Sequence, residues 1–155
     1  MNNPAPSQRP QNGFHVREVR PGDFDMGLLE TLGHLSDMGG LTPKEAKGIF
    51  RRIKKDSLYH FLVAVAADGK VIGATTLLAE QKFIHRGGLA GHIEDVVVRE
   101  GYEARGVGRS LVNAAVELAK ELGCYKCILD CKADVTGFYE GLGFRRHEIG
   151  MRLDL

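Results

Sequence analysis

The chain has 155 residues, of which 43% are hydrophobic and 26% are charged, a composition typical of a globular protein with one buried core. Its formal net charge of +1 provides no overall attraction to nucleic acid or to an anionic membrane, and no apolar run approaches the roughly 20 residues that cross a bilayer. We therefore expect a single domain over residues 13–155, with neither nucleic acid nor membrane as a partner.

The opening segment, residues 1–12, differs in composition from the rest of the chain. It holds three of the five prolines together with Asn, Gln and Ser, and it lacks the hydrophobic segment of a secretory signal. We predict that this segment is a disordered tail and that the protein is not secreted.

The first predicted elements are a strand and a helix. Phe14 and Val16 alternate with polar residues, which indicates a short strand. Asp23 is a candidate N-cap for a helix that ends at the glycine pair 39–40. Four apolar residues would share one face of that helix: Phe24, Leu28, Leu32 and Leu35.

A second helix and a hairpin follow. Thr42 and Glu45 form a capping box with Pro43 at the first helical position, so a helix should start there. Residues 59–66 and 71–78 are rich in β-branched and aromatic residues, and Asp68-Gly69 lies between them as a hairpin turn.

The second half of the chain alternates strands and helices. We predict a loop over 81–88, strands over 92–98, 124–131 and 149–155, and helices over 109–122 and 135–142. The last strand would present one apolar face, made of Ile149, Met151, Leu153 and Leu155. This order predicts an α/β fold with a mixed, mostly antiparallel sheet and helices on both faces.

The three cysteines, Cys124, Cys127 and Cys131, have a C-x2-C-x3-C spacing that invites a metal interpretation. No His-x-x-x-His pattern completes a zinc set, and the three residues lie within one predicted strand. An odd number of cysteines without a secretory signal is typical of the reducing cytoplasm. We therefore expect structural thiols, no metal and a cytoplasmic location.

The segment 92–110 is the best candidate for a functional site. A strand carries the adjacent carboxylates Glu94 and Asp95, and a glycine loop then opens a helix. Backbone N–H groups at a helix N-terminus bind anions, and the carboxylates could hold an amine beside that anion. An ordinary tight turn would fit the two glycines alone, but the combination favours a group-transfer enzyme.

Three blocks carry a resemblance to a known family: His92-Ile93-Glu94-Asp95, the run 124–131, and Phe138-Tyr139-Glu140 followed by Gly143-Phe144. With the order of elements, they resemble the glucosamine 6-phosphate N-acetyltransferases of the GNAT superfamily, over roughly residues 14–151. The resemblance implies the GNAT fold, acetyl transfer from acetyl-coenzyme A (acetyl-CoA) to the amine of glucosamine 6-phosphate, and a homodimer joined through the C-terminal strand. The product would feed UDP-N-acetylglucosamine synthesis.

The resemblance also implies how acetyl-CoA binds. A bulge near 96–97 would open a gap beside the strand for the pantetheine arm, and the glycine loop would bind the pyrophosphate. The residues concerned are Val96, Val97, Val98, Arg105, Gly106, Val107, Gly108, Arg109, Ser110 and Tyr139. Three positions depart from the family pattern: Glu103 replaces Arg or Gln, Ala104 a frequent Gly, and Val135 an Asn. We expect Glu103 to turn away from the pyrophosphate.

For the reaction, the resemblance implies that Glu94 accepts the amine proton, Asp130 orients the amine and Tyr139 protonates the leaving thiolate. The implied substrate contacts are Ser36, Lys82, Ile84, His85, Glu94, Asp95, Asp130 and Arg152. Asp154 stands where the family commonly has a basic residue, so Arg152 is the candidate replacement.

Two other functions remain open from the sequence. The chain could acetylate a different small primary amine, in which case Lys82 and His85 would not serve a phosphate. It could also be a non-catalytic coenzyme A-binding module, although the candidate residues Glu94, Asp130 and Tyr139 argue for catalysis.

Overall fold

The computed structural model describes residues 13–155, so the predicted tail over 1–12 lies outside the described residues. Five strands form one sheet in the order β1-β2-β3-β4-β5. They are β1 (Phe14–Glu18), β2 (Tyr59–Ala66), β3 (Val71–Gln81), β4 (Leu89–Val98) and β5 (Cys124–Ile128). The first four pair antiparallel and β5 pairs parallel to β4, so the mixed, mostly antiparallel sheet is confirmed.

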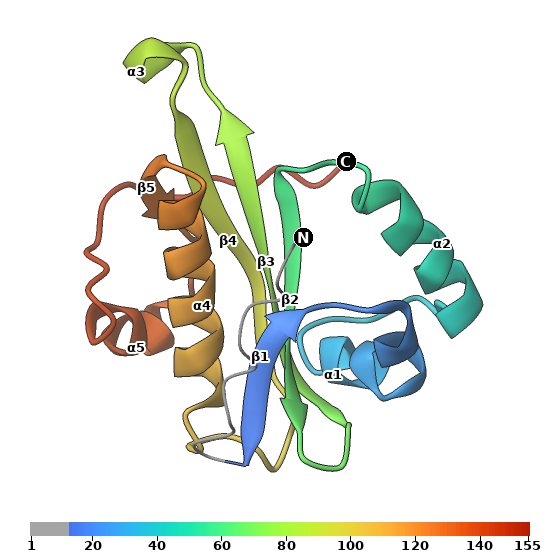
Figure 1. Cartoon of the computed structure of the whole chain (residues 1–155). Helices are drawn as coiled ribbons and strands as arrows, with labels where there is room; N and C mark the ends of the chain where they lie inside the picture. Colours follow the sequence, from blue (N-terminus) through green and yellow to red (C-terminus); the bar gives the residue numbers. More distant parts are fainter. Residues whose placement is uncertain (1–12) are drawn as a thin grey trace, which may run out of the picture.

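Helices lie on both faces of this sheet (Figure 1). They are η1 (Pro21–Asp25), α1 (Leu28–Gly33), α2 (Pro43–Ile53), α3 (Ile84–Gly87), α4 (Val107–Glu121), η2 (Ala133–Val135) and α5 (Thr136–Glu140). None of the helices in residues 13–155 is long and apolar enough to span a bilayer.

Each face of the sheet has its own hydrophobic core. On one face, α4 packs Leu111 and Val112 against Leu77 and Ile93 of the sheet. On the other face, α1 and α2 cover a second cluster that includes Leu28, Phe50, Val63, Val65 and Val97. The two layers hold β3 and β4 rigidly from both sides, which is what positions the groups at the end of β4.

A glycine in β3 allows α4 to approach the sheet closely. A Cβ atom on Gly73 would lie 2.8 Å from Val107 Cγ1 and 2.9 Å from Leu111 Cδ1, closer than real Cβ contacts allow. The glycine therefore sets the spacing between the sheet and the first turns of α4.

The prediction for the first helix was wrong at its start and in its length. Asp23 lies inside η1, where its carboxylate accepts hydrogen bonds from the Arg20 N–H (2.6 Å) and the Arg17 guanidinium (2.7 Å). Gly27, with φ +88°, then separates η1 from α1, which ends at Gly33 rather than at the next glycine pair. The buried ion pair and the left-handed glycine break the helix that the apolar periodicity predicted.

The prediction for α2 and the β2–β3 hairpin is confirmed. Thr42 and Glu45 cap α2 reciprocally, with the Thr42 hydroxyl accepting from the Glu45 N–H at 3.3 Å. The hairpin turns at Gly69, whose φ is +86°. Both features depend on local residue choices and were therefore readable from the sequence.

The β3–β4 hairpin is longer than expected and forms an arm. Its strands continue to Gln81 and from Leu89, and the predicted loop contains the single turn α3. Figure 1 shows α3 at the far end of this arm, beyond the other strands. Phe83 and Ile84 at its tip are exposed, which leaves two large apolar side chains in solvent.

The C-terminal region differs most from expectation. The predicted strand over 124–131 ends at Ile128. The helix predicted over 135–142 corresponds to the shorter α5, which η2 precedes. Residues 149–155 form no strand, because no strand within residues 13–155 pairs with them. Their apolar side chains are almost fully exposed, from 83% at Leu153 to 116% at Leu155.

Candidate active site

The parallel strands β4 and β5, at one side of the sheet, separate partway along β4. Their pairing ends at His92 and Ile128, so the rest of β4 has no neighbour on that side within the described chain. On the other side, Thr76 pairs with Glu94 but Ala74 pairs with Val97, which is a bulge. Residues 95 and 96 together oppose Thr75, so the bulge lies one position earlier than the sequence suggested.

Main-chain groups of β4 point into this gap. The Arg99 N–H donates to the Ile72 carbonyl oxygen of β3 at 2.9 Å. Because successive N–H groups of a strand point in opposite directions, those of Val98 and Val96 face away from β3. The gap therefore offers hydrogen-bonding groups to an extended ligand.

The N-terminus of α4 lies beside the end of β4. Gly106 caps the helix with φ +80°, and the first intrahelical bond runs from the Ser110 N–H to the Gly106 carbonyl (2.9 Å). The N–H groups of Val107, Gly108 and Arg109 therefore have no acceptor within the helix. Three free N–H groups at the positive end of a 15-residue helix form a suitable site for a phosphate group.

Unusual residues precede this helix. The Glu103 carboxylate accepts a hydrogen bond from the Gly101 N–H at 2.7 Å, within its own loop. Ala104 has φ +59°, a conformation in which glycine would be unstrained. The Arg105 guanidinium lies 5.0 Å from the ring centroid of Tyr102, so a cation stays beside the helix N-terminus.

Acidic side chains gather where β4 leaves β5. Burial raises the pKa of Glu94, the negative charges of Asp95 and Asp130 raise it further, and His92 opposes the shift. Asp95 occupies the bulge with φ +52°. Asp130 follows the end of β5, and the tail returns to it, since a Cβ on Gly150 would lie 3.1 Å from Asp130 Oδ1. The cluster therefore brings charge from two strands to one place, where it suits an ammonium group.

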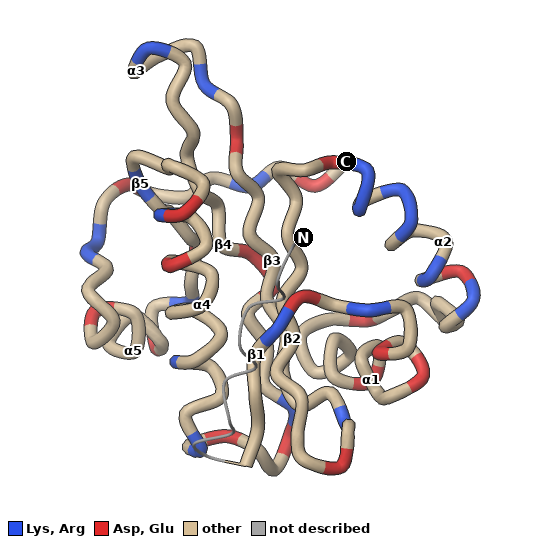
Figure 2. Tube along the Cα trace, viewed as in Figure 1, with Lys and Arg blue, Asp and Glu red and all other residues tan. Residues whose placement is uncertain are grey.

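Figure 2 shows how this charge is distributed over the fold: acidic positions occur on β4 in the middle of the sheet, and basic positions follow α2. The acidic side chains therefore lie on a strand of the sheet, whereas most of the basic residues on helices belong to α2.

Tyr139 lies on α5, next to the start of α4. Its ring packs edge-on against Phe138 (4.9 Å between centroids) and Phe144 (6.1 Å). A Cβ on Gly108 would lie 3.5 Å from Phe138 Cζ and 3.5 Å from Val98 Cγ2, so α5, α4 and β4 meet there. Burial, followed by the charge of Cys131, raises the pKa of Tyr139. The phenol therefore keeps its proton throughout the neutral range and can act as an acid.

The predicted phosphate contacts lie elsewhere. Lys82, Ile84 and His85 belong to the arm, where Lys82 forms an ion pair with Glu80 and the His85 ring lies 4.2 Å from that of Tyr125. Within residues 13–155, no hydrogen bond or ion pair joins them to the acidic cluster.

Two further predicted contacts are also separate from that cluster. Ser36 is exposed in the loop after α1. The Arg152 Nε donates to Asp154 Oδ1 at 2.7 Å, on the exposed tail. This bond keeps the Arg152 side chain engaged with its own neighbour, Asp154.

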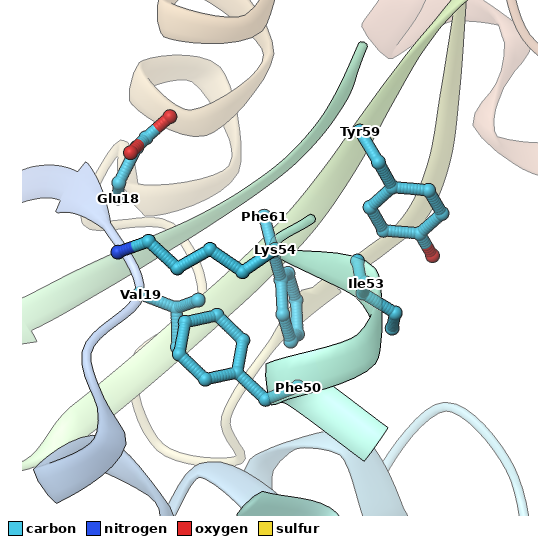
Figure 3. Close-up of a pocket in the computed structure, with 7 residues that line it drawn as sticks. All are labelled: Glu18, Val19, Phe50, Ile53, Lys54, Tyr59 and Phe61. Atoms are coloured by element: carbon cyan, nitrogen blue, oxygen red, sulfur yellow. The ribbon is translucent and has the colours of Figure 1, made fainter. Parts of the chain in front are cut away.

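A pocket between β1, β2 and α2 does not belong to the site. Figure 3 shows its lining, which consists of Glu18, Val19, Phe50, Ile53, Lys54, Tyr59 and Phe61. None of the candidate residues contributes to it, and its lining is mostly apolar. It is an indentation where α2 packs on the sheet rather than a place for acyl transfer.

Sequence reasoning missed one pair of polar residues on β3 and β4. His92 Nε2 and Glu80 Oε2 lie 2.8 Å apart. Alternation along the strand shows that residues 92 and 94 share a face, but no local pattern shows that Glu80 lies beside His92.

Comparison with known proteins agrees with this geometry. The model of the acetyltransferase (GNAT) family matches residues 34–144. A glucosamine 6-phosphate N-acetyltransferase from Trypanosoma brucei brucei is 39% identical over 127 residues, which are 82% of this chain and 86% of that protein. One from Candida albicans is 34% identical over 134 residues, which are 86% of this chain and 90% of that protein.

A solved structure shares the whole architecture. The crystal structure of glucosamine-6-phosphate N-acetyltransferase from Arabidopsis thaliana superposes with a TM-score of 0.88 at 32% identity, covering 91% of this chain and 97% of that one. The region matched by the family model contains the bulge of β4, the N-terminus of α4 and α5. By sequence and by structure, this chain belongs to the GNAT family of acetyltransferases.

Proposed function

We propose that the protein transfers the acetyl group of acetyl-CoA to the amine of D-glucosamine 6-phosphate, giving N-acetyl-D-glucosamine 6-phosphate and coenzyme A, on the way to UDP-N-acetylglucosamine. The observation that carries this proposal is the acidic cluster of Glu94, Asp95 and Asp130 beside the opening between β4 and β5. A cluster of carboxylates selects an amine, and the opening suits a long thioester. The names of relatives at 39% and 34% identity support this sugar as the acceptor.

The coenzyme binds along β4 and ends at α4. The pantetheine arm lies in the opening and hydrogen-bonds the main chain of Val96 and Val98, while Val97 keeps the strand anchored in the core. The pyrophosphate binds the N–H groups of the segment from Arg105 to Ser110, and Arg109 adds positive charge. The close approach of Gly108 to Val98 and Phe138 supports this path of the coenzyme, because it brings the end of β4 and the N-terminus of α4 together.

The reaction is a direct transfer within a ternary complex. Glu94 accepts a proton from the ammonium group, and the free amine attacks the thioester carbonyl carbon. A C–N bond forms as the C–S bond breaks. Tyr139 donates its proton to the leaving thiolate, and the second proton that the nitrogen loses as it becomes an amide returns the tyrosinate to its phenol form. Asp130 orients the amine. Holding the two substrates together supplies a large effective concentration, so no acyl-enzyme is required.

The phosphate of the sugar is bound by groups from two copies of the chain. Lys82 and His85 lie on the projecting arm and Arg152 on the exposed tail, and both segments carry exposed apolar side chains. A second copy that pairs with the tail would cover these side chains and bring the cations to an acidic cluster. The protein is therefore a homodimer, with Ser36 and Ile84 lining the acceptor pocket.

The enzyme works in the cytoplasm. Its three cysteines are free thiols in the structure, which is the form that a reducing compartment maintains.

One assay tests the function directly. Release of free thiol from acetyl-CoA is followed with glucosamine 6-phosphate, with unphosphorylated glucosamine and with a polyamine such as spermidine. We expect rapid release with the phosphosugar only. Faster release with spermidine would assign another amine as the acceptor, and binding of acetyl-CoA without turnover of any of the three amines would indicate a non-catalytic module.

A further inference from the structure

His92 and Glu80 form a polar pair that the reaction as described does not use. His92 Nε2 lies 2.8 Å from Glu80 Oε2, and Lys82 forms an ion pair with the same carboxylate oxygen. The His92 side chain is 26% exposed, so the pair lies at the edge of solvent rather than in the core. A histidine held by a carboxylate is a common arrangement for moving protons.

The register of the sheet places this pair on the face that carries Glu94. Leu78 of β3 pairs with His92, and Thr76 pairs with Glu94. Residues 92 and 94 precede the bulge, so their side chains leave β4 on the same side, with Cβ atoms about 7 Å apart. The charge of His92 acts on Glu94, since it lowers the pKa that burial and the neighbouring carboxylates raise.

We propose, on the basis of the proposed acetyl transfer, that His92 is a positioning residue that carries the amine proton from Glu94 to solvent, with Glu80 holding its ring. The bond to Glu80 keeps a hydrogen on Nε2, so the neutral ring has its lone pair on Nδ1. No hydrogen bond occupies Nδ1 within the described chain, and this nitrogen is the proton acceptor.

The proton balance is simple. The substrate ammonium gives one proton to the Glu94 carboxylate, which becomes a carboxylic acid. That acid passes the proton through a water molecule to Nδ1 of His92, and the imidazolium is stabilised by the Glu80 carboxylate until it releases the proton to bulk water. Glu94 and His92 are then both ready for the next turnover. The relay gives Glu94 a route to bulk water, because His92 lies two residues before it on the same strand face and its side chain is 26% exposed.

The charged groups facing this path come from three places. Glu80 belongs to β3 and Lys82 follows the end of that strand, Asp95 adjoins Glu94 on β4, and Asp130 follows β5. Lys82 and Glu80 largely offset each other, so the net field on Glu94 is set by the two aspartates against His92.

The test uses His92→Gln, which keeps an amide near Glu80 but removes the titratable ring. We expect kcat to fall about 10- to 100-fold, with the dissociation constant for acetyl-CoA unchanged. The acid limb of the kcat profile should move to higher pH, because Glu94 loses a positive neighbour. His60→Gln is the matched control: His60 bonds Glu18 at 2.9 Å on the other side of the sheet, and its loss should leave kcat and the profile in place.

Two further measurements make the result decisive. Glu80→Gln should also lower kcat, and the double variant should be no slower than His92→Gln alone, because both changes break one relay. Imidazole added to His92→Ala should restore part of the rate even where that variant is less stable. Unchanged kcat in His92→Gln, additive losses in the double variant, or no rescue by imidazole would each overturn the relay.

The proposal that His92 relays the proton and the proposal that glucosamine 6-phosphate is the acceptor can be contradicted independently. If the parent protein turns over another amine faster, the same variants are measured with that amine, and the expected losses are the same.

Discussion

Glu94 illustrates how neighbouring residues fit a carboxylate to a reaction with an amine. Burial disfavours its charged form, and the charges of Asp95 and Asp130 disfavour it further, so its pKa lies above the usual range. A carboxylate with a raised pKa is a stronger base towards an ammonium ion. The cost is that the base is lost at a higher pH than for an ordinary glutamate.

The first prediction concerns this pH dependence. Activity should fall as the pH drops through the pKa of Glu94, because the protonated carboxyl cannot accept the amine proton. Asp130→Asn removes a negative neighbour, so the pKa of Glu94 should fall and the acid limb of the kcat/KM profile should move to lower pH. The rate at every pH should also be lower, because Asp130 no longer orients the amine. Asp134→Asn, at an exposed position of η2, is the control. An acid limb that stays in place would mean that Glu94 does not control it.

The second prediction concerns the proton donor. Tyr139→Phe keeps the packing against Phe138 and Phe144 but removes the hydroxyl, so kcat should fall by about 10- to 10⁴-fold while acetyl-CoA binding persists. Rapid-quench kinetics and a binding titration measure the two quantities. Tyr59→Phe, on β2, serves as the control. An undiminished chemical rate would remove Tyr139 from the role of acid.

At the scale of single residues, the identities of the site residues could be predicted from the sequence, but their arrangement in space could not. Glu94, Asp95 and Asp130 could be named from short motifs. The left-handed conformation of Asp95 and the partnership of His92 with Glu80 depend on how β4 pairs with β3, which no local pattern encodes.

At the scale of elements, the contact between α4 and β3 determines where the anion site lies. The third prediction is that Gly73→Ala pushes Val107 and Leu111 away from the sheet. We expect a loss of about 1–3 kcal/mol in unfolding free energy from overpacking, together with weaker acetyl-CoA binding. Denaturant unfolding and a binding titration measure these effects.

The control for this substitution is Gly48→Ala in α2. A Cβ there would meet only the end of the Arg51 side chain at 3.9 Å, and alanine favours a helix. We expect equal or greater stability in this variant. A Gly73→Ala protein as stable as the parent would show that α4 does not need this close approach.

Elements with local signals were predicted well, and elements that depend on distant partners were not. The capping box at Thr42 and the turn at Gly69 are encoded by adjacent residues. The break at Gly27 depends on the ion pair between Arg17 and Asp23, which joins a strand to η1. The strand predicted over 149–155 requires a partner strand, and residues 13–155 do not supply one.

At the scale of the whole molecule, two exposed apolar segments, the arm and the tail, supply the surface that the proposed dimer would bury. The fourth prediction is that replacing Met151 and Leu153 with Asp breaks the dimer, because a charged strand face cannot be buried between subunits. Sedimentation should show monomer, and activity should be lost although Glu94 and Tyr139 remain. His147→Gln with Glu148→Gln, in the same segment, should stay dimeric. An active parent that sediments as a monomer at micromolar concentration would contradict the proposed dimer.

The separation of β4 from β5 has a consequence for the lifetime of the protein. Most sheets leave main-chain groups unpaired only on their outermost strands, whereas here β4, the next strand in, also has unpaired groups where β5 separates from it. A bound coenzyme that covers them stabilises the folded state, by about 2.7 kcal/mol at a concentration of one hundred times its dissociation constant. We expect acetyl-CoA to slow proteolysis and raise the melting temperature, so the abundance of the enzyme would follow the supply of its own acetyl donor.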